Sequence, residues 1–245
     1  MIRGVLFDLG NTLVSYWLRM AWPGMLQTAL AGPTTWLAEQ RGLQIDPLEM
    51  AQRVQTENYE APDFRVRPLS GRLARIYCLA DDAPELDELC KLFCKPLLAE
   101  GRLYPDTLPT LAALHHRSYK LGLVSNMPWG CPSGPWLAEL QRLGLAEWLE
   151  AIIFCTDVGW RKPAPQPFQA ALQQLGLEAA ECLFVGDDPR WDLAGPQALG
   201  MPALVLDREG TLDLPGETVI HQLSEILALL PGISHSNGQP GLAPA

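Results

Sequence analysis

The sequence is poor in lysine, in histidine and in long apolar stretches, and each shortage excludes a class of protein. It has 245 residues, a formal net charge of −10 and only four histidines. Nucleic acids and anionic membrane surfaces bind basic patches, so this charge argues against both as partners. No apolar stretch reaches the ~18 residues that suggest a transmembrane helix. The first residues lack the zones of a secretory signal peptide, and we expect a cytoplasmic protein.

The six cysteines form neither a CxxC pair nor a cysteine–histidine spacing typical of zinc sites. We therefore expect reduced thiols buried in a core. Apolar residue types make up 48% of the chain, which is ordinary for a folded domain. The length suits one large domain or two smaller ones with a sizeable core.

Short apolar runs followed by polar residues recur along the chain and have the length of buried strands. Helical patterns separate the later runs. This alternation predicts an α/β fold with a parallel sheet covered by helices on both faces. The expected strands are residues 2–7, 119–124, 151–155, 182–185 and 202–206, and the expected helices are residues 106–117, 134–143 and 166–175.

The segment between the first strand and the rest of the sheet has a different pattern, with helix signals and few strand-like runs. Asp46 begins a capping box with proline at the first helical position, and Gly42 is placed to end an earlier helix. Asp82 repeats the capping pattern and is expected to begin a helix that Gly101 ends. The pattern predicts an all-helical insertion.

These patterns divide the chain into three parts. An α/β core comprises residues 1–14 and 103–232, and the helical insertion comprises residues 15–102. Residues 233–245 lack apolar periodicity, and we expect a disordered tail there.

Polar residues that can carry chemistry follow four of the apolar runs. They are Asp8, then Ser125 with Asn126, then Lys162 after a short loop, and Asp187 with the acids that follow it. The carboxyl ends of parallel strands face one crevice, so we expect these side chains to gather there. Carboxylates suit Mg²⁺, hydroxyl and amide groups can donate to an oxyanion, and an aspartate can attack phosphorus.

The same segments resemble the haloacid dehalogenase (HAD) superfamily, subfamily IA, which has a helical cap. The resemblance lies in VLFDLGNTL at 5–13, LGLVSNM at 121–127, VGWRKPAPQPF at 158–168 and LFVGDDPRWDLAG at 183–195. It implies a Rossmann-like core with a cap domain inserted after the first strand. It also implies a hydrolase of small phosphorylated metabolites that uses Mg²⁺. Oligomeric state is not implied.

The resemblance also implies a role for each matching residue. Asp8 corresponds to the nucleophile, with Lys162 as the lysine that orients it. Phosphate binding falls to Ser125, Asn126 and Lys162. The metal ligands implied are Asp8, the carbonyl of Gly10 and Asp187, and the supporting residues are Thr12, Asp188 and Asp192. We expect Asp188 either to bind metal or to cap the next helix.

Gly10 departs from the phosphatase pattern, because such enzymes usually carry a second aspartate two residues after the nucleophile. That aspartate protonates the leaving oxygen, and general acid–base help is typically worth 10²–10⁴-fold. We hypothesise that the enzyme prefers good leaving groups or takes a proton from the cap or solvent. Two alternatives stay open, namely a catalytically weak metal- and phosphate-binding regulatory module and a 2-haloacid dehalogenase. The dehalogenases need no metal and usually have a bulky aromatic residue at this position.

The arginines of the insertion offer a further possibility. Arg19, Arg65 and Arg67 could reach an anionic substrate, although a solvated face is the simpler expectation.

Overall fold

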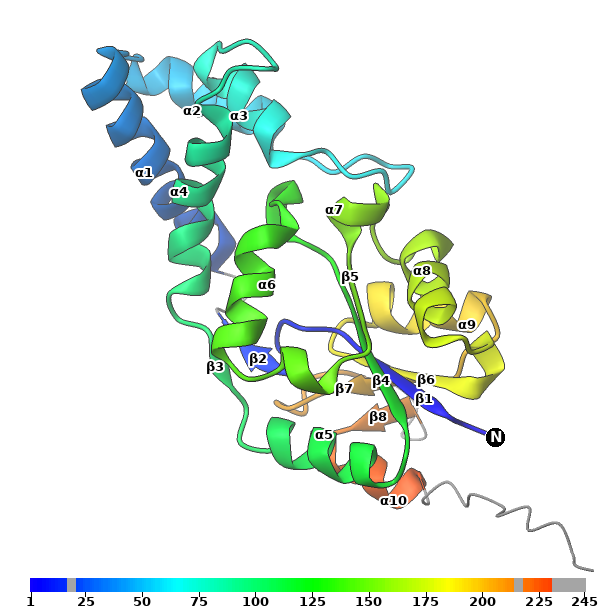
Figure 1. Cartoon of the computed structure of the whole chain (residues 1–245). Helices are drawn as coiled ribbons and strands as arrows, with labels where there is room; N and C mark the ends of the chain where they lie inside the picture. The colour runs from blue at the N-terminus through cyan, green and yellow to red at the C-terminus, as the bar shows by residue number, and fades with distance from the viewer. Residues whose placement is uncertain (17–20, 214–217, 231–245) are drawn as a thin grey trace, which may run out of the picture.

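The computed structural model describes residues 1–16, 21–213 and 218–230. A six-stranded parallel sheet has the order β5-β4-β1-β6-β7-β8, with helices on both sides (Figure 1). The predicted α/β fold is confirmed. The strands of this sheet are β1 (Gly4–Phe7), β4 (Lys120–Ser125), β5 (Ala151–Phe154), β6 (Cys182–Gly186), β7 (Ala203–Leu206) and β8 (Val219–Ile220).

Alternating side chains of the central strand divide the core into two layers. Val5 and Phe7 point into the layer that includes helices α5, α6 and α10, whereas Leu6 points into the layer that includes α8. A strand buried on both faces needs this continuous apolar run. The helices of the sheet region are α5 (Thr107–His116), α6 (Ser133–Arg142), α7 (Cys155–Val158), α8 (Pro165–Leu175), α9 (Ala194–Ala198) and α10 (Ile226–Leu229).

Four helices follow the first strand and pack together at one end of the molecule (Figure 1). The apolar side chains of this insertion belong to the same core cluster as one face of the sheet. Phe93 of the insertion stacks on Trp129 of the sheet region, with ring centroids 5.5 Å apart. The four helices are α1 (Trp22–Arg41), α2 (Pro47–Glu57), α3 (Leu69–Tyr77) and α4 (Leu86–Leu98).

The two ends of the insertion lie side by side in a short antiparallel pair. This pair joins β2 (Val14–Ser15) to β3 (Arg102–Leu103). The chain therefore leaves and re-enters the sheet region at one place. The helical insertion is confirmed, whereas its definition as a separate domain of residues 15–102 stays a prediction. The expected tail at 233–245 lies outside the described residues.

Local helix signals succeeded at two places in the insertion and failed at a third. The Asp46 carboxylate accepts hydrogen bonds from the backbone N–H groups of Leu48 and Glu49, at 2.9 and 3.1 Å. Gly42 ends α1 in the left-handed conformation, at φ +63°. The predicted helix start at Asp82 is wrong, because α4 begins four residues later with no side-chain cap. A turn precedes it, with the Leu86 N–H donating to the carbonyl of Ala83 at 3.1 Å.

No helix in the described ranges combines the length and the apolar character needed to cross a membrane.

Candidate active site

Strand β1 brings Asp8 to the carboxyl edge of the sheet. The Asp8 N–H donates to the carbonyl of Val185 on β6 at 2.9 Å, so the sheet fixes the backbone there. The chain then turns sharply, because the N–H groups of Leu13 and Val14 both donate to the carbonyl of Leu9. Asn11 occupies the left-handed region within this turn, at φ +59°. The turn places Asp8 and Gly10 on the wall of a cavity.

Thr12 lies in the same turn but is fully buried and is not on the cavity wall. Its carbonyl accepts a hydrogen bond from Arg208 at 2.9 Å, and this contact ties the turn to the segment after β7. The location fits support of the nucleophile loop, and that role stays a prediction.

Strand β4 delivers Ser125 and Asn126 to the same cavity. The Asn126 side chain holds the backbone of Lys162 at both of its ends. Its Oδ1 accepts from the Lys162 N–H at 2.8 Å, and its Nδ2 donates to the Lys162 carbonyl at 3.2 Å. The hydrogen bonds of this amide therefore position Lys162. Phosphate binding by Asn126 stays a prediction.

Lys162 donates hydrogen bonds to two carboxylates. Its Nζ lies 2.6 Å from Asp8 Oδ1 and 2.7 Å from Asp192 Oδ1, and only 2% of its side chain is exposed. Burial by itself lowers the pKa of this ammonium, but Asp192 and Asp8 outweigh that effect and raise the pKa above its ordinary value. Lys162 is therefore a permanent cation beside the predicted nucleophile.

The loop after β6 carries three aspartates with different surroundings. Asp187 lies on the cavity wall. Asp192 is fully buried, with one oxygen on Lys162 and the other accepting from the Asp188 N–H at 3.0 Å. Burial raises the pKa of Asp192 to about 6, against the opposing charge of Lys162. Asp188 caps the following helical turn, because its Oδ1 accepts from the Arg190 N–H at 2.9 Å.

The carboxylates of this site can be tested for their fit to a divalent cation. One ligand oxygen from each of Asp8, Asp187 and Asp192 lies within 4.8 Å of the others. Hard oxygen donors on one or two carboxylates match the needs of Mg²⁺. Both oxygens of Asp192 already accept hydrogen bonds from the protein. The residues fit a divalent cation.

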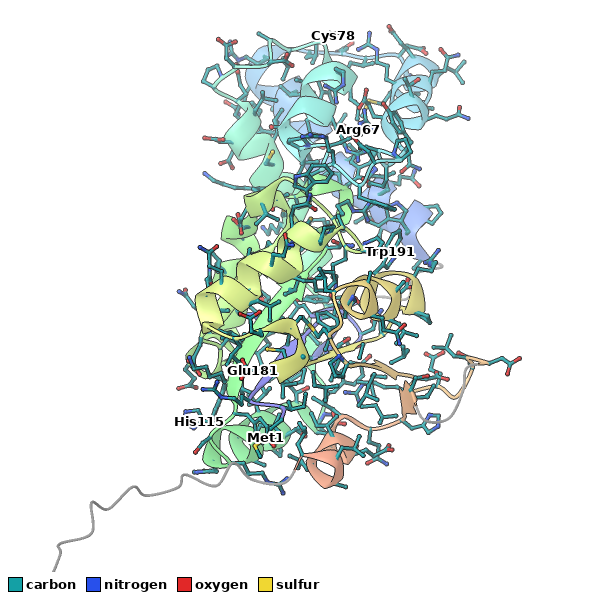
Figure 2. The ribbon with its side chains drawn as sticks, turned by 90° about the vertical axis from the view of Figure 1, so that its right-hand side faces the viewer. Met1, Arg67, Cys78, His115, Glu181 and Trp191 are labelled. Atoms are coloured by element: carbon teal, nitrogen blue, oxygen red, sulfur yellow. The ribbon has the colours of Figure 1, made fainter. Side chains whose placement is uncertain are left out.

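The cavity above these groups measures about 270 Å³ and suits a small molecule. Part of its wall comes from residues that carry no recognised motif role. Arg161 lies directly before Lys162, and Arg190 and Trp191 lie between Asp188 and Asp192. Figure 2 shows Trp191 below Arg67, on the side of the sheet region that faces the insertion. Tyr16, Trp136, Arg161, Arg190 and Trp191 all line the cavity and were not predicted.

The insertion arginines named from the sequence have other partners. Arg67 donates to Glu57 at 2.5 Å, and Arg65 lies over the ring of Trp160, 4.4 Å from its centroid. Neither lines the cavity, and Arg19 lies outside the described residues. Adjacency of Arg161 to Lys162 was the sequence signal that could have identified the arginine at the site.

Comparison with known proteins places this geometry in a family. A model of haloacid dehalogenase-like hydrolases matches residues 2–200. The chain therefore belongs to this family of hydrolases, and it is an enzyme. A phosphoglycolate phosphatase of Shigella sonnei is 29% identical, in a match covering 97% of this chain and 96% of that protein. A phosphoglycolate phosphatase of Rhodospirillum rubrum is 36% identical, but the match spans only 52% of this chain and 53% of the relative.

Other relatives differ in their named activities. A ribulose-1,5-bisphosphate 5-phosphatase of Halopiger xanaduensis is 28% identical, over 84% of this chain and 85% of that protein. The solved 2-haloacid dehalogenase of Pseudomonas syringae pv. Tomato superposes with a TM-score of 0.65 and 28% identity. That match covers 94% of this chain and 98% of the dehalogenase.

Proposed function

We propose that this hydrolase is a Mg²⁺-dependent phosphatase of small phosphomonoesters that forms an aspartyl-phosphate at Asp8. The observation that carries the proposal is the shared Lys162 ammonium, 2.6 Å from Asp8 and 2.7 Å from Asp192, beside a cavity with Asp187 on its wall. The phosphatase names of the relatives support the same reaction. We further propose a cytoplasmic enzyme that acts on a phosphorylated metabolite and not on nucleic acid.

The reaction has two displacements at phosphorus. A carboxylate oxygen of Asp8 forms a bond to phosphorus while the bond to the ester oxygen breaks and its electron pair leaves with the alcohol. Water then attacks the aspartyl-phosphate and releases inorganic phosphate and the free carboxylate. Lys162 orients Asp8 through its charge-assisted hydrogen bond, and Ser125 is placed on the cavity wall to donate to the phosphoryl oxygens.

Asp8, Asp187 and the Gly10 carbonyl are the groups that would hold Mg²⁺. The ion supplies positive charge that offsets the repulsion between the phosphate and the carboxylates. Asp192 acts through Lys162, because both of its oxygens accept hydrogen bonds from the protein. Asp188 supports this loop by capping the turn that carries Asp192.

The leaving alcohol must take its proton from a group other than residue 10, because Gly10 has no side chain. Esters with good leaving groups need that proton least. We therefore expect faster hydrolysis of an aryl phosphate than of an alkyl phosphate, and equal rates would contradict this part of the proposal.

The decisive experiment is hydrolysis of p-nitrophenyl phosphate with Mg²⁺ or with EDTA. We expect activity with Mg²⁺ and little with EDTA. Asp8→Asn should lower kcat by ~10³-fold or more, because an amide is a poor nucleophile. Asp157→Asn is the matched control, since Asp157 is exposed on α7. Activity of Asp8→Asn equal to that of the wild type would overturn the proposal.

Assays on the same purified enzyme distinguish the phosphatase from two alternative functions. Likeness to the Pseudomonas protein keeps a dehalogenase as the second candidate, and halide release from 2-chloropropanoate in EDTA would support it. The fit of Asp8 and Asp187 to a cation favours the phosphatase. Near-zero rates of both wild type and Asp8→Asn across a broad phosphate panel would instead indicate a regulatory binding module.

A further inference from the structure

Arg161 is a cation of the cavity wall that the proposed chemistry does not use. Its backbone N–H donates to the carbonyl of Phe64 at 2.8 Å, which fixes it beside the insertion. Its side chain is only 18% exposed, and its guanidinium lies 5.7 Å from the ring centroid of Trp191. The residue is therefore held in place on the wall next to Lys162.

The guanidinium of Arg161 has one acidic partner and unused donors. Its Nη1 lies 2.8 Å from Glu60 Oε2, and Glu60 also pairs with Arg72 at 3.1 Å. The Nε of Arg161 is buried and has no hydrogen-bond partner among the described residues. A buried donor of this kind calls for an acceptor. The side chain also lines the cavity, so its guanidinium is within reach of a ligand there.

The other cations of the cavity are already engaged. Lys162 is shared by two carboxylates. Arg190 binds Asp188 through both Nε and Nη2, at 3.1 and 2.8 Å. The Arg190 side chain is also 69% exposed, whereas that of Arg161 is 18% exposed. A second negative charge on a substrate would therefore be less screened by solvent at Arg161 than at Arg190.

We propose that Arg161 binds a second anionic group of the substrate, a carboxylate close to the phosphate ester, and that Glu60 positions it. This inference rests on the proposed phosphatase function and narrows its substrate class. The planar guanidinium matches a carboxylate in shape and charge. A cavity of about 270 Å³ favours a compact ester over a long one. The helical insertion thus takes part in substrate choice through Glu60.

The test compares phosphoglycolate with ethyl phosphate, which has two carbons and no carboxylate. We expect Arg161→Met to raise KM for phosphoglycolate ~30-fold or more with little change in kcat, because a lost charge-assisted contact weakens binding. KM for ethyl phosphate should stay within ~threefold of the wild-type value. Glu60→Gln should change KM in the same direction but less. Arg65→Met is the matched control, since Arg65 is an exposed arginine of the segment that carries Glu60 and is not on the cavity wall.

Equal losses on both substrates would show that Arg161 is structural and would overturn the inference, as would an unchanged KM for phosphoglycolate. Calorimetric titration of phosphoglycolate into the wild type and Arg161→Met measures binding affinity independently of hydrolysis. It therefore tests the anion site even if the proposed function fails. If the wild type hydrolyses neither these esters nor p-nitrophenyl phosphate, the phosphatase proposal fails. Weaker binding to Arg161→Met would still support the anion site, whereas equal binding would reject it.

Discussion

Buried charges gather in two regions of this protein, at the carboxyl edge of the sheet and in the helical insertion. At the sheet edge, one ammonium on Lys162 serves the carboxylates of Asp8 and Asp192, and Asp8 faces a cavity. In the insertion, two arginines form ion pairs with the single carboxylate of Glu57. Arg67 Nη2 lies 2.5 Å from Oε2, and Arg75 Nε lies 2.8 Å from Oε1.

The surroundings of the two clusters explain their different uses. In the insertion, the backbone carbonyls of Glu57 and Tyr59 also accept hydrogen bonds from Arg67 and Arg72. These arginines thus bind the carboxylate and the carbonyls that follow α2, and the cluster stabilises the connection between α2 and α3. At the sheet edge, acids outnumber the lysine and open onto space that a substrate can enter. Buried charge therefore serves stability where protein groups satisfy it and chemistry where a cavity adjoins it.

The largest effect should come from removing the cation of the sheet edge. Lys162→Met leaves Asp8 and Asp192 without their shared ammonium, and kcat on p-nitrophenyl phosphate should fall ~10³-fold. Steady-state kinetics with Mg²⁺ measures this loss, and thermal denaturation by circular dichroism shows whether the variant folds. Lys91→Met is the control, since Lys91 is exposed. A folded Lys162→Met enzyme with more than a tenth of the wild-type rate would show that the charge cluster at the sheet edge is not required for catalysis.

The corresponding change in the insertion should affect stability instead. Glu57→Gln removes the charge that Arg67 and Arg75 enclose, and the free energy of unfolding should fall by about 2 kcal/mol. Activity per folded molecule should change less than ~threefold, because Glu57 does not line the cavity. Urea denaturation and kinetics measure both quantities, and Glu88→Gln on the exposed side of α4 is the control. A loss of activity without a loss of stability is the contrary outcome.

The stabilisation by Glu57 should also depend on pH. Burial raises the pKa of this carboxyl, but hydrogen bonds and charge from Arg75 and Arg67 outweigh it, and the net pKa is lowered. A carboxyl with a lowered folded pKa stabilises the protein above its unfolded pKa of about 4.3. That contribution is lost as pH falls through the folded value. The stability gap between wild type and Glu57→Gln should thus be full at pH 6 and shrink below pH 4. A gap independent of pH would exclude the ionised pair as its cause.

The smallest effect should come from adding a carboxylate to the sheet edge. A Cβ at Gly10 would meet only Tyr16 Cδ2 at 3.8 Å, so an aspartate has room. Gly10→Asp should raise kcat for an alkyl phosphate ~tenfold and leave p-nitrophenyl phosphate nearly unchanged, because only the poor leaving group needs an acid. The ratio of the two rates is the measurement, with Gly134→Asp on α6 as control. An unchanged ratio would show that another group already supplies the proton.

The regular elements and the residues at strand ends were predictable from the sequence. Apolar runs indicated five of the six strands, because a strand buried on both faces must be continuously apolar. Strand β8 has only two residues and gives no such signal. The start of α4 was mispredicted because Asp82 has the residue type of a cap without making its hydrogen bond. Trp191 was missed because nothing in its local sequence shows that it faces a cavity, and Arg161 was missed although it lies directly before Lys162.

The sequence by itself determined that Asp8, Ser125 and Asp187 would reach one edge of the sheet, because parallel strands place their carboxyl ends together. Only the tertiary structure decided which side chains form hydrogen bonds and ion pairs there. Lys162 and Asp8 are 154 positions apart, and their 2.6 Å contact depends on how Asn126 holds the Lys162 backbone. Hydrogen bonds act only over short distances and at defined angles, so the packing of the loops fixed these partners.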